Sequence, residues 1–416
     1  MFRERRNIRD TSFHQRGAAW NARERLLYRQ LLRRAAAVLI ADVCLASQES
    51  DDSYRECAID QTGTPRPLLL AALCTVIQRS RLRRARTVSV PPVLRLNRTV
   101  DSFTDSECRD YFRFSKLDLR RLHRALRLPD QIRCQNRSKS PSEEALMILL
   151  RRLATPNRLG DLPVLFGREA SQLSRVCNTL IDMIYQRHLS VLRDRLHRWV
   201  PDFEKFARCV RVKTTMGLGS IVGFVDGTFR PNCTPGGHDD IQRELFSGHK
   251  RRHGLKYQGT MLPNGIIADL YGPYSGRRND AFLVTNSELN NRLAAAQAGR
   301  PVQYKIYGDA AYSITSHISR GYGGVNVTAA QREWNRQMSS ARICVEWGFG
   351  KVVKQFAFID HAADLKLFLQ QIGKLYMVAV LCTNAHTCCY GSQTGEYFGV
   401  QAPTLEEYFS MSLEEQ

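Results

Sequence analysis

The chain has 416 residues, a formal net charge of +21 and a pI near 9.8. A surplus of positive charge of this size favours a polyanionic partner, and nucleic acid is the first candidate. No apolar run approaches the ~18–20 residues of a membrane span, and the N-terminus lacks the apolar core of a secretion signal. The composition therefore argues against a membrane protein and against a secreted one.

Residues 1–100 are the most basic part of the chain, with 19 arginines, no lysine and 9 acidic residues. The apolar periodicity of residues 20–46 favours one or two helices, and residues 79–86 are a basic run. Such runs are typical of solvated surfaces or flexible tails, whereas a nuclear import signal or a phosphate contact is the functional alternative. We expect a partly disordered region in a nuclear protein, with the cytoplasm as a second location.

Residues 101–205 are predicted to be helical. Ser115 precedes a helix over residues 116–126 and is a suitable N-cap. Ser142, which follows Pro141, is expected to cap a helix that extends to residue 153, with two glutamates in its first turn.

A longer helix is predicted from about Ser171 to His188, because apolar residues recur there at positions that form one face of a helix. A short helix at residues 159–166 and a turn at Gly167 precede it, and together they resemble a helix-turn-helix with Gln172 and Arg175 on the open face. A plain helical bundle packed on the following domain explains the same pattern.

Residues 206–392 are expected to form a catalytic domain. Residues 221–225 are a mostly apolar run that ends at Asp226 and is followed by Gly227. Such a run predicts a strand buried on both faces, and a carboxylate at its end needs a cation or a hydrogen-bond donor. An aspartate that merely caps the turn is the structural alternative. Residues 304–308 repeat the pattern and lead into Asp309.

A third carboxylate, Glu346, lies in a helix entered from residues 339–340, four positions after Arg342. An ion pair between Arg342 and Glu346 within that helix is the structural alternative, worth only ~0.2–0.5 kcal/mol. Two strand-end aspartates and a helical glutamate also form the ligand set of a two-metal phosphoryl-transfer site, because hard divalent cations prefer oxygen ligands. We therefore expect a divalent cation, Mg²⁺ or Mn²⁺, as the cofactor.

The rest of this domain is read as a mixed α/β arrangement. A hairpin is predicted over residues 255–262 and 265–271. Helices are predicted over about residues 280–297 and 365–381, and a C-terminal tail over residues 393–416. Basic side chains near the strands are candidate DNA-phosphate contacts, although a solvated hairpin tip explains the first three as well. These side chains are Lys250, Arg251, Arg252, Arg277 and Arg278.

Four motifs in a fixed order carry a family resemblance. They are Val225-Asp-Gly-Thr228, Tyr274-Ser-Gly-Arg-Arg-Asn-Asp280, Gly308-Asp-Ala-Ala-Tyr312 and Arg342-x-x-x-Glu346-x-x-Phe349-Gly. The ordered set resembles the PIF/Harbinger transposases, which are DDE enzymes, over about residues 105–392. The 36 residues between Asp309 and Glu346 are close to the mid-thirties spacing typical of such enzymes. The resemblance implies that Asp226, Asp309 and Glu346 are the catalytic, metal-binding triad.

The resemblance also implies a fold and an activity. The fold is a ribonuclease-H-like mixed sheet with flanking helices, preceded by an all-α helix-turn-helix-like region. The activity is metal-dependent cleavage and joining of DNA phosphodiesters. A catalytically silent, transposase-derived module that binds DNA or protein is the alternative, and an RNA-directed nuclease rests on the fold class alone.

Three further expectations come from the same resemblance. Asp280 occupies the place of a His-Asp pair, but Asn279 precedes it here, so a metal ligand and a helix cap both stay open for Asp280. A separate Myb-like DNA-binding protein is implied as a partner. The oligomeric state stays open, a homo-oligomer included.

The 12 cysteines contain no CxxC pair, which fits a reducing compartment better than a disulfide scaffold. His386 with Cys382 and Cys388 has poor spacing for zinc, so packing is the expected role of these three residues.

Overall fold

The computed structural model describes residues 98–156, 161–214, 219–236 and 239–410, together with Leu96 and Leu159. All of them belong to one of the two units of the chain, Ser89–Gln416. The helices predicted within residues 20–46 and the basic run at residues 79–86 lie outside the described residues.

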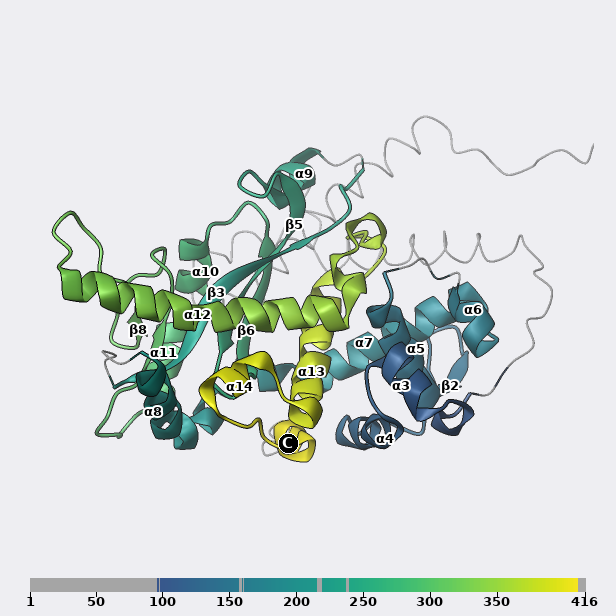
Figure 1. Cartoon of the computed structure of the whole chain (residues 1–416). Coiled ribbons are helices and arrows are strands. Elements are labelled where there is room, and N and C mark those ends of the chain that lie inside the picture. Colours follow the sequence, from purple (N-terminus) through teal and green to yellow (C-terminus); the bar gives the residue numbers. More distant parts are fainter. Residues whose placement is uncertain are drawn as a thin grey trace, which may run out of the picture. The chain divides into compact units, whose positions relative to one another are not determined.

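A mainly helical region comes first, as predicted (Figure 1). It also contains a short antiparallel hairpin that the sequence analysis did not expect. Its elements are η2 (Val100–Ser102), α3 (Asp105–Phe112), α4 (Lys116–Ala125), β1 (Gln131–Arg133), β2 (Lys139–Pro141), α5 (Ser142–Ala154), α6 (Asp161–Phe166), α7 (Ala170–Arg193), η3 (Leu196–Asp202) and α8 (Phe203–Lys213).

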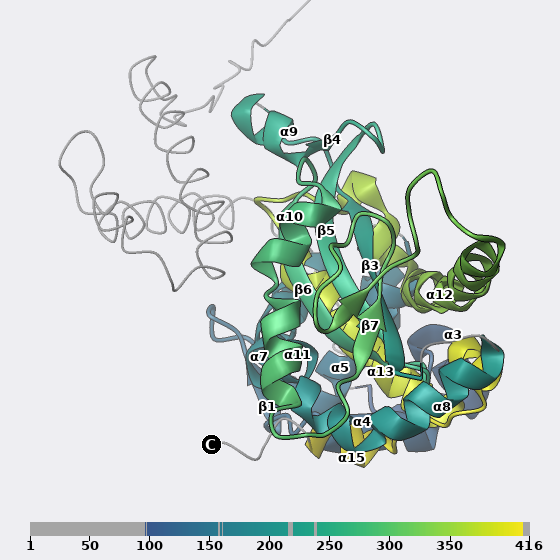
Figure 2. The same cartoon turned by 90° about the vertical axis from the view of Figure 1, so that its left-hand side faces the viewer.

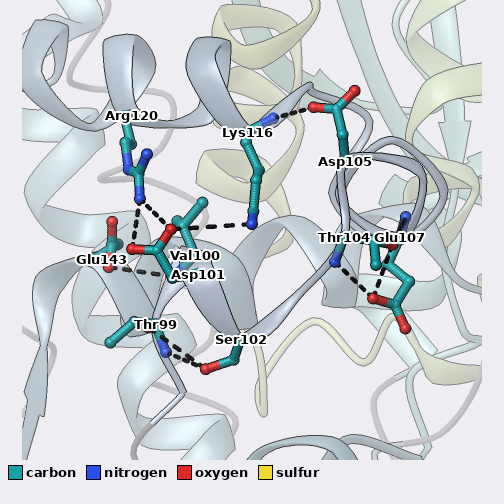
Figure 3. A network of polar contacts seen from close by, with 10 residues as sticks. All are labelled: Thr99, Val100, Asp101, Ser102, Thr104, Asp105, Glu107, Lys116, Arg120 and Glu143. Carbon is teal, nitrogen blue, oxygen red and sulfur yellow. Dashed lines mark hydrogen bonds and ion pairs between the residues drawn. The ribbon is translucent and has the colours of Figure 1, made fainter.

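Side-chain caps fix the starts of the first helices. Thr104 and Glu107 form a reciprocal capping box at α3, and Asp101 pairs with Arg120 at 2.6 Å nearby (Figure 3). Ser115 caps α4, which confirms the prediction. The prediction for Ser142 is wrong: Ser142 is the first helical residue of α5, and its hydroxyl contacts His123 instead.

Helix α7 is longer than predicted, and its apolar face is confirmed. The six apolar residues that define the periodicity are all buried. The helix packs against α5, α13 and β6, and its Asp182 accepts hydrogen bonds from Gln371 and Lys374, which places charge against α13. The side chains predicted to face away from the bundle, Gln172 and Arg175, are half-buried near its N-terminus.

A mixed six-stranded sheet follows, which confirms the predicted α/β class. Strands β3, β5 and β6 pair antiparallel, whereas β3, β7 and β8 pair parallel. Strand β5 pairs with β3 on one side, and with β6 as the predicted hairpin around Asn264. The strands are β3 (Ile221–Pro231), β4 (Phe246–Ser247), β5 (Arg252–Met261), β6 (Ile267–Ser275), β7 (Lys305–Tyr307) and β8 (Ile318–Ser319).

Helices cover both faces of the sheet. Figure 2 shows α12 on one side of the sheet and α10 with α11 on the other. The helix predicted over residues 280–297 is two helices, because Glu288 between them adopts a left-handed backbone conformation with φ 48°. The elements are α9 (Asp239–Leu245), α10 (Asp280–Asn286), α11 (Leu289–Ala296), α12 (Ala329–Gln355), η4 (Ala357–Asp360), η5 (Ala362–Asp364) and α13 (Ile372–Tyr390).

The C-terminal part of the chain differs from the prediction. Helix α13 begins at Ile372 rather than near residue 365, and the segment expected to be a tail contains α14 (Gln393–Phe398) and α15 (Leu405–Ser410). Phe398 and Phe409 are buried, so this segment contributes to the core. None of the helices that the structure describes combines the length and the apolar character of a membrane span. Every cysteine among the described residues is free.

Candidate active site

Two neighbouring parallel strands bring Asp226 and Asp309 together. The last aligned pair of β3 and β7 is Phe224 with Tyr307, and each aspartate follows two residues later in its own segment. Asp309 lies just beyond the end of β7, in the turn where its Oδ1 accepts from the N–H of Ala311 at 2.9 Å, and neighbouring strands lie ~4.8 Å apart. The two aspartates therefore lie at one level of the sheet.

Asp226 lies beyond the end of its neighbour β7 because β7 is short. We expected β3 to turn at Gly227, but it continues to Pro231, since its second half pairs with β5 residue by residue. Strand β7 ends at Tyr307, so β3 has no β7 partner beyond Phe224. Asp226 is thus a mid-strand residue beside the end of its neighbour, and the predicted strand boundary was wrong.

Both carboxylate oxygens of Asp226 accept a hydrogen bond. The backbone N–H of Gly227 donates to Oδ1 at 2.8 Å, and Nη1 of Arg342 donates to Oδ2 at 2.6 Å. Burial raises the pKa of Asp226, the Arg342 guanidinium and the Gly227 N–H oppose that rise, and the charges of Asp309 and Asp280 add to it. The carboxylate is therefore in a site of excess negative charge that stabilises a cation.

Tyr312 lies beside these carboxylates. The turn after β7 brings it there: the backbone N–H of Tyr312 donates to the carbonyl of Asp309 at 3.2 Å. A Cβ at Gly308 would come within 2.6 Å of the Tyr312 ring, so only glycine permits this approach. The Tyr312 side chain is 1% exposed, and its hydroxyl has no hydrogen-bond partner among the described residues.

Burial first, and then the charges of Asp226, Asp280 and Asp309, raise the pKa of Tyr312 well above its usual value. The phenol is therefore neutral, and it carries a proton that it can donate. The sequence analysis quoted Tyr312 within a motif but gave it no role. The only signal in the sequence that could have suggested a role for Tyr312 was its position three residues after Asp309.

Glu346 lies on α12, one turn after Arg342, and is exposed. The alternative of an Arg342–Glu346 ion pair does not apply in this structure, because Arg342 pairs with Asp226, 116 residues away in the sequence. No ion pair of Glu346 is present in the part of the chain that the structure describes. Helix α12 thus reaches the aspartates through Arg342.

Asp280 lies on the opposite face of β3. Its Oδ1 atom is 2.7 Å from the position that a Cβ of Gly227 would take, and successive residues of a strand point to opposite faces. Its Oδ1 also contacts Nζ of Lys256 at 3.4 Å. The cap of α10 is Asn279, whose side chain accepts from the N–H of Phe282 at 2.8 Å, so helix capping is not the role of Asp280.

The candidate DNA-binding side chains near the sheet gather at one end of it. Lys250, Arg251 and Arg252 form the exposed turn before and into β5. Arg277 and Arg278 follow β6, whose end pairs with the start of β5. Arg277 also pairs with Glu244 of α9 at 3.2 Å. The two basic groups are therefore neighbours on the hairpin.

The donor chemistry fits a hard divalent cation, although the full ligand set is not assembled. Asp226 already holds a cationic guanidinium, and the Tyr312 hydroxyl is a buried polar group without a partner. In the described part of the chain, no three side chains of His, Cys, Asp or Glu are grouped closely enough to hold a metal ion. His386, the centre of the weak zinc alternative, contacts the rings of Phe114 and Tyr390.

Comparison with known proteins gives one match. Residues 225–384 match the family described as DDE superfamily endonuclease. No curated protein and no solved structure matches the chain. The matched segment begins one residue before Asp226 and includes Asp280, Asp309, Tyr312, Arg342 and Glu346. This chain therefore contains, in residues 225–384, a segment similar to DDE superfamily endonucleases.

Proposed function

We propose that the chain is a divalent-metal-dependent DNA endonuclease of the transposase type, similar to the PIF/Harbinger enzymes. The parallel register that puts Asp226 and Asp309 at one level of the sheet carries the proposal. Glu346, on the helix that covers this face, is the third proposed catalytic residue. Mg²⁺ or Mn²⁺ is the proposed cofactor, held by the three carboxylates, whereas Asp280 on the opposite face is a weaker candidate ligand.

The proposed reaction is a displacement at phosphorus. A water oxygen joins the phosphorus atom as the bond from phosphorus to the 3′ oxygen breaks, and the proton that the water loses balances the one that the 3′ oxygen gains. Joining repeats the displacement, with the freed 3′-hydroxyl as the nucleophile on a target phosphodiester. A divalent cation bound at the carboxylates supplies charge stabilisation and lowers the pKa of the attacking water.

The chain's own side chains orient these groups. The Gly227 N–H holds Oδ1 of Asp226, and Arg342 holds Oδ2 while no cation is bound. Tyr312 lies beside these carboxylates as a neutral phenol, and its hydroxyl is buried. These contacts prepare the site before substrate binds, which reduces the reorganisation needed in the transition state.

The basic end of the β5–β6 hairpin is the proposed DNA-backbone contact. About six strand residues separate Asp226 from this end along β3 and β5, which is roughly 20 Å at ~3.3 Å per residue. That distance corresponds to about six base pairs of a duplex. A strand bound at the carboxylates can therefore also contact the five basic side chains there. Gln172 and Arg175 on α7 remain a further proposed contact.

A catalytically silent module that binds DNA or protein is the second candidate. The separation of the carboxylates favours this candidate. Among the described residues, no three carboxylates lie close enough together to hold a metal ion. Nuclear location, a Myb-like partner and homo-oligomerisation belong to either candidate as proposals. They rest on the resemblance and on the basic composition of the chain.

Nicking of supercoiled plasmid tests the proposal. The purified chain is incubated with Mn²⁺ or with EDTA, and Asp226→Asn and Glu346→Gln are compared with wild type. We expect each substitution to reduce nicking by about 10²-fold or more, because each removes a cation ligand. Glu333→Gln is the matched control, since Glu333 is on the same helix but pairs only with Arg336 and Gln337.

DNA binding is measured in parallel by gel shift. Nicking by Asp226→Asn at the wild-type rate contradicts the proposed mechanism. Absence of nicking in wild type, with DNA binding intact, favours the binding module.

A further inference from the structure

Arg342 is the one cationic side chain in contact with Asp226 among the described residues. It reaches from α12 to the middle of β3, and its Nη1 lies 2.6 Å from Oδ2 of Asp226. The two side chains are 22% and 20% exposed, so solvent and ions can reach the pair. The contact is single rather than bidentate, which makes it easier to replace.

The charges around this contact do not balance. The charges of Asp309 and Asp280 both act on Asp226, while Arg342 is paired with Asp226 and Lys256 with Asp280. Lys256 is paired with Asp280 on the other face of the strand. The guanidinium of Arg342 therefore offsets only one of the two carboxylate charges, those of Asp226 and Asp309, on this face.

Both oxygens of Asp226 are already in use. Oδ1 accepts from the Gly227 N–H, which is backbone and fixed by the pairing of β3 with β5. Oδ2 accepts from a side chain that has several rotatable bonds. An incoming cation can therefore gain access to Asp226 most readily at Oδ2.

We infer that Arg342 is the resident counter-ion of Asp226, and that a divalent cation binds by displacing its guanidinium from Oδ2. This inference rests on the proposed function, since it takes Asp226 as a cation ligand. Arg342 then lowers the affinity of the site for the cation, and it prevents repulsion between Asp226 and Asp309 while no cation is bound. It is a positioning residue rather than a catalytic one.

A purely structural role, in which Arg342 ties α12 to the sheet, predicts a different result. Helix α12 has other anchors on the same face: Trp334 packs against Tyr307 with ring centroids 5.5 Å apart, and Phe349 lies against Gly259. Loss of Arg342 therefore leaves the helix in place. If Arg342 were a structural tether, its removal would weaken cation binding. If Arg342 is a counter-ion, its removal strengthens cation binding.

The test is Mn²⁺ binding to the full chain without DNA, followed by electron paramagnetic resonance. Four proteins are compared: wild type, Asp226→Asn, Arg342→Gln and Arg336→Gln. We expect Arg342→Gln to bind Mn²⁺ about tenfold more tightly than wild type, because a competing charge is removed. Arg336→Gln is the matched control, since Arg336 is on the same helix and pairs with Glu333; its affinity should equal that of wild type.

The outcomes separate the inference from the proposed function. Equal or weaker Mn²⁺ binding by Arg342→Gln, with binding lost in Asp226→Asn, overturns the inference and leaves the proposed function standing. If wild type and Asp226→Asn have the same affinity for Mn²⁺, the proposed function itself is overturned.

A second measurement uses the wild-type side chain, in case Arg342→Gln does not fold. The ¹⁵N guanidinium signal of Arg342, assigned by its loss in Arg342→Lys, is followed as Mg²⁺ is added. We expect the slowly exchanging, hydrogen-bonded signal to be replaced by one that exchanges freely with solvent. A signal that does not change at saturating Mg²⁺ overturns the displacement.

Discussion

Two aspartates of the same sheet contact arginines in different ways. Asp269 on β6 is 1% exposed, and Arg292 of α11 contacts both of its oxygens, at 2.6 and 3.0 Å. Arg292 also donates to the carbonyls of Ser287 and Arg193. Asp226 on β3 is 20% exposed, and Arg342 contacts only one of its oxygens.

The difference separates a structural pair from an exchangeable one. A bidentate pair whose other donors are satisfied is strongly coupled to the fold, because either charge left alone in the interior is very costly. A single contact at a partly exposed carboxylate costs little to replace when another cation is available. The same residue types thus stabilise the sheet in one place and, in the inference made above, form an exchangeable contact in another.

The largest expected effect comes from breaking the buried pair. Asp269→Asn should lower the free energy of unfolding by about 3–5 kcal/mol, because it breaks a bidentate ion pair whose carboxylate is buried and leaves the Arg292 guanidinium without its counter-ion. The matched substitution Asp226→Asn should lower it by less than ~1 kcal/mol, since its loss also relieves repulsion from Asp309. Urea unfolding followed by tryptophan fluorescence measures both. Equal decreases in the free energy of unfolding of the two variants would show that the two ion pairs are equally coupled to the fold.

A smaller effect of opposite sign is expected at Tyr312. Tyr312→Phe should raise the free energy of unfolding by about 1–2 kcal/mol, because it removes a buried hydroxyl that has no partner. Tyr257→Phe is the control, since that hydroxyl already donates to Gly373. A stability loss in Tyr312→Phe contradicts the expectation.

The smallest effect concerns Lys351, a half-buried cation that contacts no carboxylate among the described residues. Nζ of Lys351 donates to Thr387 Oγ1 at 2.8 Å and to the Gly391 carbonyl at 2.6 Å. Burial lowers the pKa of Lys351 from 10.5 to about 8.

Between these two pKa values the unfolded chain binds more protons than the folded chain, so stability should rise with pH. We expect a gain of about 1 kcal/mol from pH ~8 to pH ~9.5, relative to Lys351→Met. If the free energy of unfolding changes with pH in the same way in both proteins, Lys351 is not the cause of the pH dependence.

Local patterns predicted much of the fold. The buried face of α7 followed from apolar spacing, because a 3.6-residue period leaves one side of a helix apolar. The β5–β6 hairpin followed from a Pro-Asn break between two apolar runs. The α/β class needed only the order of these elements.

The contacts of the site could not be read in the same way. The Arg342–Asp226 contact joins residues 116 positions apart, and the Arg342–Glu346 alternative was the nearer one in sequence. The end of β3 was misplaced, because Gly227 resembled a turn signal although β5 pairs with the strand beyond it. Gly227 instead allows Asp280 to approach from the other face. Such pairings depend on tertiary structure, which overrides local preference.

The burial of α14 determines where the chain can be cut. Phe398 stacks on Phe224 with centroids 6.0 Å apart, two residues before Asp226 on the same strand. Asn384 donates to the Tyr408 hydroxyl at 2.8 Å, which links α13 to α15. A fragment limited to residues 225–384 would lose the first half of β3 and both of these contacts. The matched segment therefore lacks part of its own core, and truncation after α13 would leave Phe224, two residues before Asp226, with the Tyr307 ring but without Phe398.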